Sequence, residues 1–212
     1  GGQVAGAAKN EVRRLQTIAR QLDCVIVTVE YRLAPEATFE ASIEDNYAGL
    51  RWLHTHAEEL GVDAGRIAVF GESAGGGHAA ILANLATDRG EFPVAFQCLI
   101  YPMLDDRTGP TRRAPDHVGR YAWSAEWNCL GWACFLGFPP GGEDAPAVAV
   151  PSRRNDLRGL PPAFIGVGSI DLFVEEDIDY ASRLISAGVA TELIVIPGGF
   201  HGFDIFAPES AA

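Results

Sequence analysis

Basic residues, methionine and long apolar stretches are scarce in this chain of 212 residues. Lys and Arg number 16 against 28 Asp and Glu, so the formal net charge is −12. Because so acidic a surface repels phosphate backbones, we expect no nucleic-acid partner. The longest stretch without a charged residue, residues 127–142, is interrupted by glycines and prolines and is too short to cross a bilayer. We therefore expect no membrane insertion.

Cysteine is also scarce, with four residues in the chain. Cys24 and Cys98 lie in apolar runs, where a free thiol behaves as a small apolar side chain. Cys129 and Cys134 lack the paired spacing and the partner histidines of a zinc site. We expect four reduced thiols, no metal site and, since no basic and apolar leader opens the chain, a cytoplasmic location.

The composition that remains is typical of a folded globular protein. Apolar residues make up 48% and charged residues 21%, which excludes a disordered chain. A chain of this length forms one core rather than two domains. Met103 is the only methionine, so we expect residues 1–212 to be a single domain that is incomplete at its N-terminus.

The apolar periodicity predicts alternating helices and strands. Helices are expected over residues 7–21, 42–60, 73–87 and 177–187, and strands over residues 24–29, 66–70, 95–101, 163–168 and 192–196. This order is typical of an α/β fold with a mostly parallel sheet and helices on both faces. Residues 105–160, rich in Arg, Pro and Trp, break the order and are expected to form an insertion over the active site.

A nucleophile motif follows the second predicted strand. Gly71-Glu72-Ser73-Ala74-Gly75 has the form G-x-S-x-G and opens a helix, the setting of a nucleophile elbow. Glycines two positions on either side of Ser73 allow the strand and helix backbones to approach each other closely. The alternative interpretation is a glycine-rich turn with an incidental serine. The flanking strand and helix favour a catalytic Ser73.

A serine nucleophile needs a base, and His201 is the favoured candidate because it lies in a glycine-rich loop after the last strand. The acid should follow the preceding strand, since the chain order in this fold is Ser, then Asp or Glu, then His. Asp171 fits that position, with Glu175 as the second candidate. The other histidines are expected to be structural or solvated: His54, His56, His78 and His117.

Six stretches spread over the chain resemble the hormone-sensitive lipase group of α/β-hydrolases, which are bacterial carboxylesterases. They are Gly1-Gly2-Gln3-Val4-Ala5-Gly6, Tyr31-Arg32-Leu33-Ala34-Pro35-Glu36, Gly71-Glu72-Ser73-Ala74-Gly75-Gly76, Tyr101-Pro102-Met103-Leu104-Asp105-Asp106-Arg107, Asp171-Leu172 and His201-Gly202-Phe203. The resemblance implies an α/β-hydrolase fold, a Ser-Asp-His triad, no cofactor and a preference for short acyl chains. It also implies an oxyanion hole made by the N–H groups of Gly1, Gly2 and Ala74.

The same resemblance implies that the N-terminal cap and the first strands of the family are absent from residues 1–212. One of those strands lies, in the family, between the two strands expected here over residues 24–29 and 66–70. Gln3 also departs from the family, which usually has an apolar residue at this position of the oxyanion loop.

The predicted function is a serine carboxylesterase that hydrolyses short-chain acyl or aryl esters through an acyl-enzyme. Trp123, Trp127 and Phe200 are the candidate substrate-binding residues, although a helical stripe that includes the two Trp residues is more often core. We expect a small ester as the substrate and a homodimer as one possible assembly. The alternatives are a non-catalytic ligand-binding protein on the same fold, and an amidase or thioesterase with the same triad.

Overall fold

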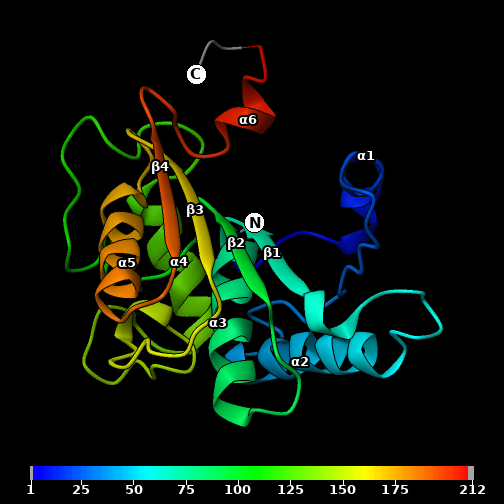
Figure 1. Ribbon diagram of the computed structural model, residues 1–212. Coiled ribbons are helices and arrows are strands. Elements are labelled where there is room, and N and C mark those ends of the chain that lie inside the picture. The colour runs from blue at the N-terminus through cyan, green and yellow to red at the C-terminus, as the bar shows by residue number, and fades with distance from the viewer. Residues whose placement is uncertain (1, 210–212) are drawn as a thin grey trace.

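Four parallel strands form the central sheet of the protein. The computed structural model describes residues 2–209. The strands lie in the order β1-β2-β3-β4 (Figure 1), and their bounds are β1 (Ala68–Glu72), β2 (Phe96–Ile100), β3 (Ala163–Gly168) and β4 (Thr191–Ile196). This sheet confirms the predicted α/β class and four of the five predicted strands.

The strands end almost level with one another. Glu72 pairs with Ile100 across β1 and β2, and Gly168 pairs with Ile196 across β3 and β4. In a parallel sheet all the carboxyl ends lie at one edge, so the loops that follow the strands meet there. This register brings together residues that are far apart in the sequence.

Residues 2–209 also form six α-helices, with bounds α1 (Ala8–Leu22), α2 (Phe39–Thr55), α3 (Ala74–Arg89), α4 (Ala125–Leu136), α5 (Val174–Ser186) and α6 (Phe203–Phe206). Helices α3 and α5 cover one face, where their small and apolar residues pack on Val69, Leu99 and Ile165. The opposite face leaves Phe70 and Ile194 exposed. Figure 1 shows α1 set apart from the sheet, beyond the edge that β1 forms.

The strand predicted over residues 24–29 is wrong for this structure. Residues 24–33 run as irregular chain, and Val25 and Val27 are exposed. A β-branched run becomes a strand only when a neighbouring strand satisfies its backbone N–H and C=O groups. Among residues 2–209, no strand lies beside this segment, and β1 therefore forms one edge of the sheet.

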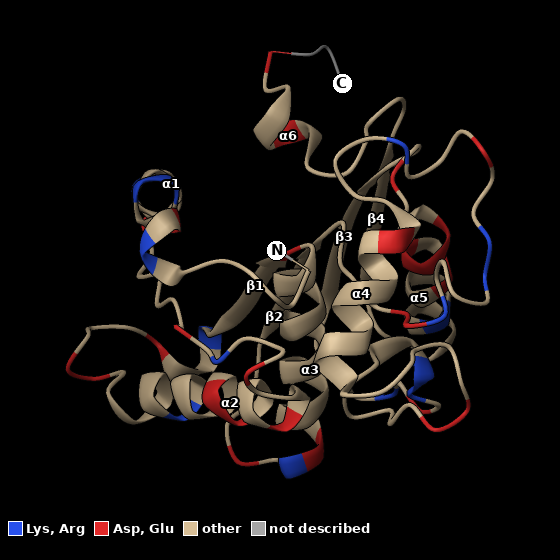
Figure 2. Cartoon of the chain, turned by 180° about the vertical axis from the view of Figure 1, so that it is seen from behind, with Lys and Arg blue, Asp and Glu red and all other residues tan. Residues whose placement is uncertain are grey.

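The insertion predicted over residues 105–160 packs closely onto the helical layer. Trp132 and Phe135 of α4 are buried in a cluster with Met103 and with Ile81 of α3. A partly buried ion pair, in which Nε of Arg153 lies 2.6 Å from Oδ1 of Asp106, joins the two ends of the insertion. Figure 2 shows α4 almost free of charged residues, as expected of a helix that packs into a core.

Candidate active site

Ser73 occupies a strained turn between β1 and α3. Its φ of 55° and ψ of −124° lie in a region that residues other than glycine rarely adopt, and such strain is typical of functional sites. Hydrogen bonds on both sides hold the turn: the Ser73 N–H donates to the Ile100 carbonyl at 2.9 Å, and its carbonyl accepts from the N–H groups of Met103 and Gly77 at 3.0 Å. The predicted elbow geometry is therefore present.

The glycines of the elbow do not contribute equally. A Cβ atom added to Gly71 would overlap the carbonyl oxygen of Gly75, and one added to Gly76 would lie 2.8 Å from Cβ of Pro102. A Cβ atom on Gly75 would meet nothing within 4 Å. The close approach of strand and helix thus requires glycine at Gly71 and Gly76, whereas the motif predicted the steric need at Gly71 and Gly75.

The side chains of Ser73, His201 and Asp171 lie in line. Oγ of Ser73 is 2.8 Å from Nε2 of His201, and Nδ1 of His201 is 2.9 Å from Oδ2 of Asp171 and 3.2 Å from Oδ1. The carboxyl group of Asp171 is fully buried, and its Oδ1 also accepts the N–H of Phe173 at 3.0 Å. A hydroxyl, an imidazole and a carboxylate in this order can transfer the hydroxyl proton to the imidazole.

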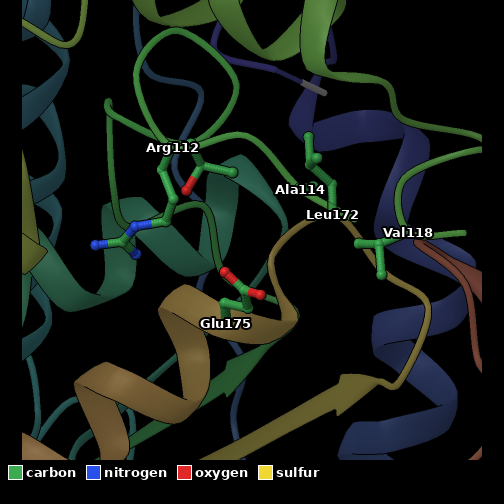
Figure 3. Close-up of a pocket in the computed structure, with 6 residues that line it drawn as sticks. Arg112, Ala114, Val118, Leu172 and Glu175 are labelled. Carbon is green, nitrogen blue, oxygen red and sulfur yellow. The ribbon is translucent and has the colours of Figure 1, made fainter. Parts of the chain in front are cut away.

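The alternatives weighed from the sequence lie elsewhere. Glu175 is exposed and lines a pocket with Arg112 (Figure 3), and it takes no part in the hydrogen bonds to His201. The ring of His54 bonds the carbonyl of Pro93, and that of His78 bonds Asn46. Burial lowers the pKa of His78 to about 4. The acid expected after a strand, Asp171, and the base expected in the glycine-rich loop, His201, are thus hydrogen-bonded to each other.

Aromatic rings surround His201, which is itself 7% exposed. The centroid of its ring lies 4.9 Å from that of Tyr101, 5.1 Å from that of Phe173 and 6.2 Å from that of Trp123. The Tyr101 hydroxyl donates to Oδ1 of Asp204 at 2.7 Å, and burial raises the pKa of this hydroxyl. Sequence reasoning missed Tyr101 and Phe173. Their signal was their position, one directly after a strand and the other two residues after Asp171.

A partly buried carboxylate lies next to Ser73. Glu72 precedes Ser73 and accepts a hydrogen bond from Arg14 of α1. Burial raises the pKa of Glu72, and the Arg14 guanidinium acts in the opposite direction. Arg14 therefore offsets a negative charge one residue from the hydroxyl that would attack a substrate.

Comparison with known proteins agrees with this geometry. A family model described as the alpha/beta hydrolase fold matches residues 1–205. The chain belongs to the α/β-hydrolase family.

Among the relatives of this α/β-hydrolase are esterase LipI of Mycobacterium tuberculosis, 36% identical, and carboxylesterase NlhH of the same species, 37% identical. The matches cover 96% and 92% of the chain and 63% and 61% of those relatives. Two solved structures are similar, a bacterial heroin esterase and esterase LipW of Mycobacterium marinum, with TM-scores of 0.89 and 0.87 and identities of 44% and 41%. They are matched over 95% and 99% of this chain and 64% and 65% of their own.

These relatives confirm the hormone-sensitive lipase group that the sequence motifs indicated. The chain spans less than two thirds of the length of each of these four relatives. A protein of the relatives' length would therefore contain parts that residues 1–212 do not include.

The predicted oxyanion donors of the α/β-hydrolase are described in part, because Gly1 lies outside the described residues. Gly2 has a φ of 63°, and its Cα lies against the ring of Trp123. The N–H of Ala74 opens α3, and among residues 2–209 no acceptor takes it. Gln3 is 2% exposed and its side-chain amide finds no partner within the same residues. Ala74 and Gly2 thus remain predicted donors.

The predicted substrate-binding residues differ in their placement. Trp123 is partly buried beside His201, and Phe200 packs against Tyr121 with ring centroids 5.7 Å apart. Trp127 lies on the outer side of α4 with 60% of its surface exposed. Trp123 and Phe200 therefore adjoin the histidine, and Trp127 stays a predicted substrate-binding residue on an exposed helix surface.

A small pocket lies next to the acid. Ala114 and Val118 of the insertion line it together with Leu172, which follows Asp171 directly (Figure 3).

No helix among residues 2–209 is long and apolar enough to cross a membrane. The described part of the chain also contains no cluster of His, Cys, Asp and Glu suited to hold a metal ion.

Proposed function

We propose that the protein containing this chain is a serine carboxylesterase that hydrolyses short-chain acyl or aryl esters. The hydrogen-bonded line from Ser73 through His201 to Asp171 carries the proposal. The relatives support it, since they are named esterase and carboxylesterase. The proposal treats residues 1–212 as one catalytic domain in which the insertion of residues 105–160 lies over the site.

In the first half of the reaction, Oγ of Ser73 attacks the ester carbonyl carbon while Nε2 of His201 takes its proton. Asp171 accepts a hydrogen bond from the Nδ1–H group of His201 and so fixes the tautomer in which Nε2 is free to act as the base. The carbonyl oxygen becomes an oxyanion, which the N–H groups of Gly1, Gly2 and Ala74 stabilise. Each such donor contributes about 2.7–4 kcal/mol to catalysis.

Collapse of the resulting tetrahedral intermediate breaks the bond to the alcohol, and His201 gives the proton to the leaving alcohol oxygen. The acyl group stays on Ser73. In the second half, His201 removes a proton from water, the resulting hydroxide attacks the acyl carbon, and the carboxylic acid leaves as the proton returns to Ser73. The aromatic rings around His201 exclude water from the imidazole and strengthen its bond to Asp171.

A fluorophosphonate tests the nucleophile, because it modifies only an activated serine. We expect one adduct per chain, mapped to Ser73 by peptide mass spectrometry, and parallel loss of p-nitrophenyl acetate hydrolysis. The Ser73→Ala variant serves as the control and should show neither the adduct nor hydrolysis. An unlabelled wild type with no turnover would favour the non-catalytic ligand-binding alternative.

Matched substrates separate esterase from related activities. The comparison uses an ester, a thioester and an anilide that share one acyl group. We expect the ester to be hydrolysed faster than the anilide, since a leaving alcohol needs less protonation by His201 than a leaving amine does. A faster thioester or anilide would reassign the reaction while leaving Ser73 as the nucleophile.

A homodimer and a cytoplasmic location also belong to the proposal. Strand β4 is an edge of the sheet and exposes Ile194 and Val195, and such an edge can pair with a second copy. All four cysteines are free, which suits a reducing compartment. Light scattering tests the dimer: Ile194→Lys should convert it to a monomer, whereas a monomeric wild type would contradict it.

A further inference from the structure

Residues 119–131 contact the loops that carry the acid and the base. The Gly119 N–H donates to the Ile170 carbonyl at 3.0 Å, one residue before Asp171. A Cβ atom on Gly119 would lie 2.9 Å from Cδ1 of Leu172. Further along the segment, the ring of Tyr121 packs against that of Phe200, which precedes His201. The segment therefore touches the neighbours of both His201 and the carboxylate that orients it.

The same segment encloses Gly2 from two sides. A Cβ atom on Gly2 would overlap Cη2 of Trp123, so the ring lies directly against the glycine. On the other side, a Cβ atom on Gly131 of α4 would lie 2.6 Å from the carbonyl oxygen of Gly2. Gly2 therefore has little freedom to move toward either neighbour, and α4 needs a residue without a side chain at Gly131.

A buried amide fixes the Trp123 ring. Nε1 of Trp123 donates to Oδ1 of Asn128 at 3.2 Å, and Nδ2 of Asn128 donates to the carbonyl of Thr108 at 2.8 Å. The Asn128 side chain is fully buried. Ala122, directly before Trp123, has a φ of 61°, a strained value for a residue with a side chain. The backbone strain and the buried hydrogen bonds together hold one orientation of the ring.

We infer that Asn128 and Gly131 are positioning residues for the oxyanion hole, acting on Gly2 through Trp123 and through direct contact respectively. The inference rests on the proposed function, in which the Gly2 N–H stabilises the oxyanion. Oxyanion donors act within a narrow range of about 2.7–3.1 Å from the oxygen, so a small displacement of Gly2 weakens the transition state more than it weakens substrate binding. The insertion thus contributes to rate as well as to any selection of substrate.

Two inhibitors of the same shape distinguish positioning from pocket lining. A trifluoromethyl ketone forms a tetrahedral adduct with Ser73 and needs the oxyanion hole, whereas the matching methyl ketone occupies the pocket without that adduct. For Asn128→Ala, we expect kcat for p-nitrophenyl acetate and affinity for the trifluoromethyl ketone to fall together by about three- to tenfold, the usual worth of one hydrogen bond. KM and affinity for the methyl ketone should stay within about twofold.

Trp123→Phe keeps an aromatic ring and removes the donor to Asn128, so it provides a conservative second test. If the hydrogen bond between the two side chains is the cause, the double variant should lose little beyond Asn128→Ala alone. Gly131→Ala should lower the affinity for the trifluoromethyl ketone at least as much as Asn128→Ala does, because the added Cβ displaces Gly2. Leu130→Ala, at an exposed position of the same helix, is the matched control and should leave the affinity for both inhibitors unchanged.

The outcomes separate the two proposals. A folded Asn128→Ala variant with wild-type kcat, or with equal loss of both ketones, would overturn the positioning role while the esterase stands. A wild type that neither hydrolyses esters nor reacts with fluorophosphonate would overturn the proposed function, and the positioning role with it. Melting temperatures of all variants show which losses come from unfolding.

Discussion

Replacing Asp171 with Asn tests the proposed proton transfer at a single atom. The structure determines how the new amide would lie, because Oδ1 of Asp171 accepts the Phe173 N–H at 3.0 Å. The Asn carbonyl oxygen must take this position, since an amide NH₂ there would oppose the N–H. The NH₂ group then occupies the position of Oδ2, 2.9 Å from Nδ1 of His201.

This orientation selects the wrong tautomer of the histidine. Facing a donor, Nδ1 of His201 becomes an acceptor, and the imidazole proton moves to Nε2, 2.8 Å from Oγ of Ser73. An imidazole protonated at Nε2 cannot take the serine proton. In serine proteases the equivalent change costs about 10⁴-fold in kcat, or about 5 kcal/mol of transition-state stabilisation. We expect a loss of similar size for Asp171→Asn.

Four measurements check the reasoning. The kcat on p-nitrophenyl acetate should fall by about 10⁴-fold, and fluorophosphonate labelling should slow in parallel. Nitrogen NMR of His201 should show the proton on Nε2. The melting temperature should stay close to that of the wild type, because the Asn carbonyl oxygen keeps the hydrogen bond from the Phe173 N–H. A folded variant that loses less than about tenfold in kcat would refute the role of Asp171.

Two further predictions follow from close contacts and from burial. Gly71→Ala should lower the melting temperature and slow fluorophosphonate labelling, because its Cβ overlaps the Gly75 carbonyl. Gly75→Ala has free space for its Cβ and should melt no lower than the wild type. Equal melting temperatures of the two variants would contradict the close contact at Gly71. The second concerns His78, whose buried imidazole has its pKa lowered from 6.5 to about 4, so the unfolded chain binds the proton more readily. The free energy of unfolding that this group contributes is complete above pH 6.5 and falls by about 3 kcal/mol as the pH drops to 4. The melting temperature of His78→Gln should therefore depend less on pH across that interval than that of the wild type. An unchanged pH dependence would show that His78 does not titrate there.

Much of the site follows from the sequence because the chemistry imposes local patterns. The elbow around Ser73 combines a strand, a strained turn and a helix within a few residues, and each leaves a mark in residue type and periodicity. Asp171 and His201 follow because parallel strands deliver their carboxyl ends to one edge, so the residues after each strand meet. The position directly after a strand then favoured Asp171 over Glu175, and the glycine-rich loop favoured His201 over the other histidines.

Interactions between segments that are distant in the sequence could not be predicted from local residue patterns. Whether residues 24–29 form a strand depends on a neighbouring strand, which the apolar pattern of the segment itself does not encode. The contact of Gly131 with Gly2 joins the N-terminal loop to α4, whose local sequence resembles an ordinary core helix. The steric need at Gly76 likewise comes from Pro102, at the end of another strand.

The sequence alone therefore determined the α/β class and indicated Ser73 as the candidate nucleophile with Asp171 and His201 as its candidate partners, because these depend on local periodicity and on the direction of the strands. Only the tertiary structure decided which rings enclose His201, which glycines must lack a side chain and which side chains hold Gly2. Those properties depend on distances between segments that the chain brings together when it packs, and short-range patterns carry no information about them.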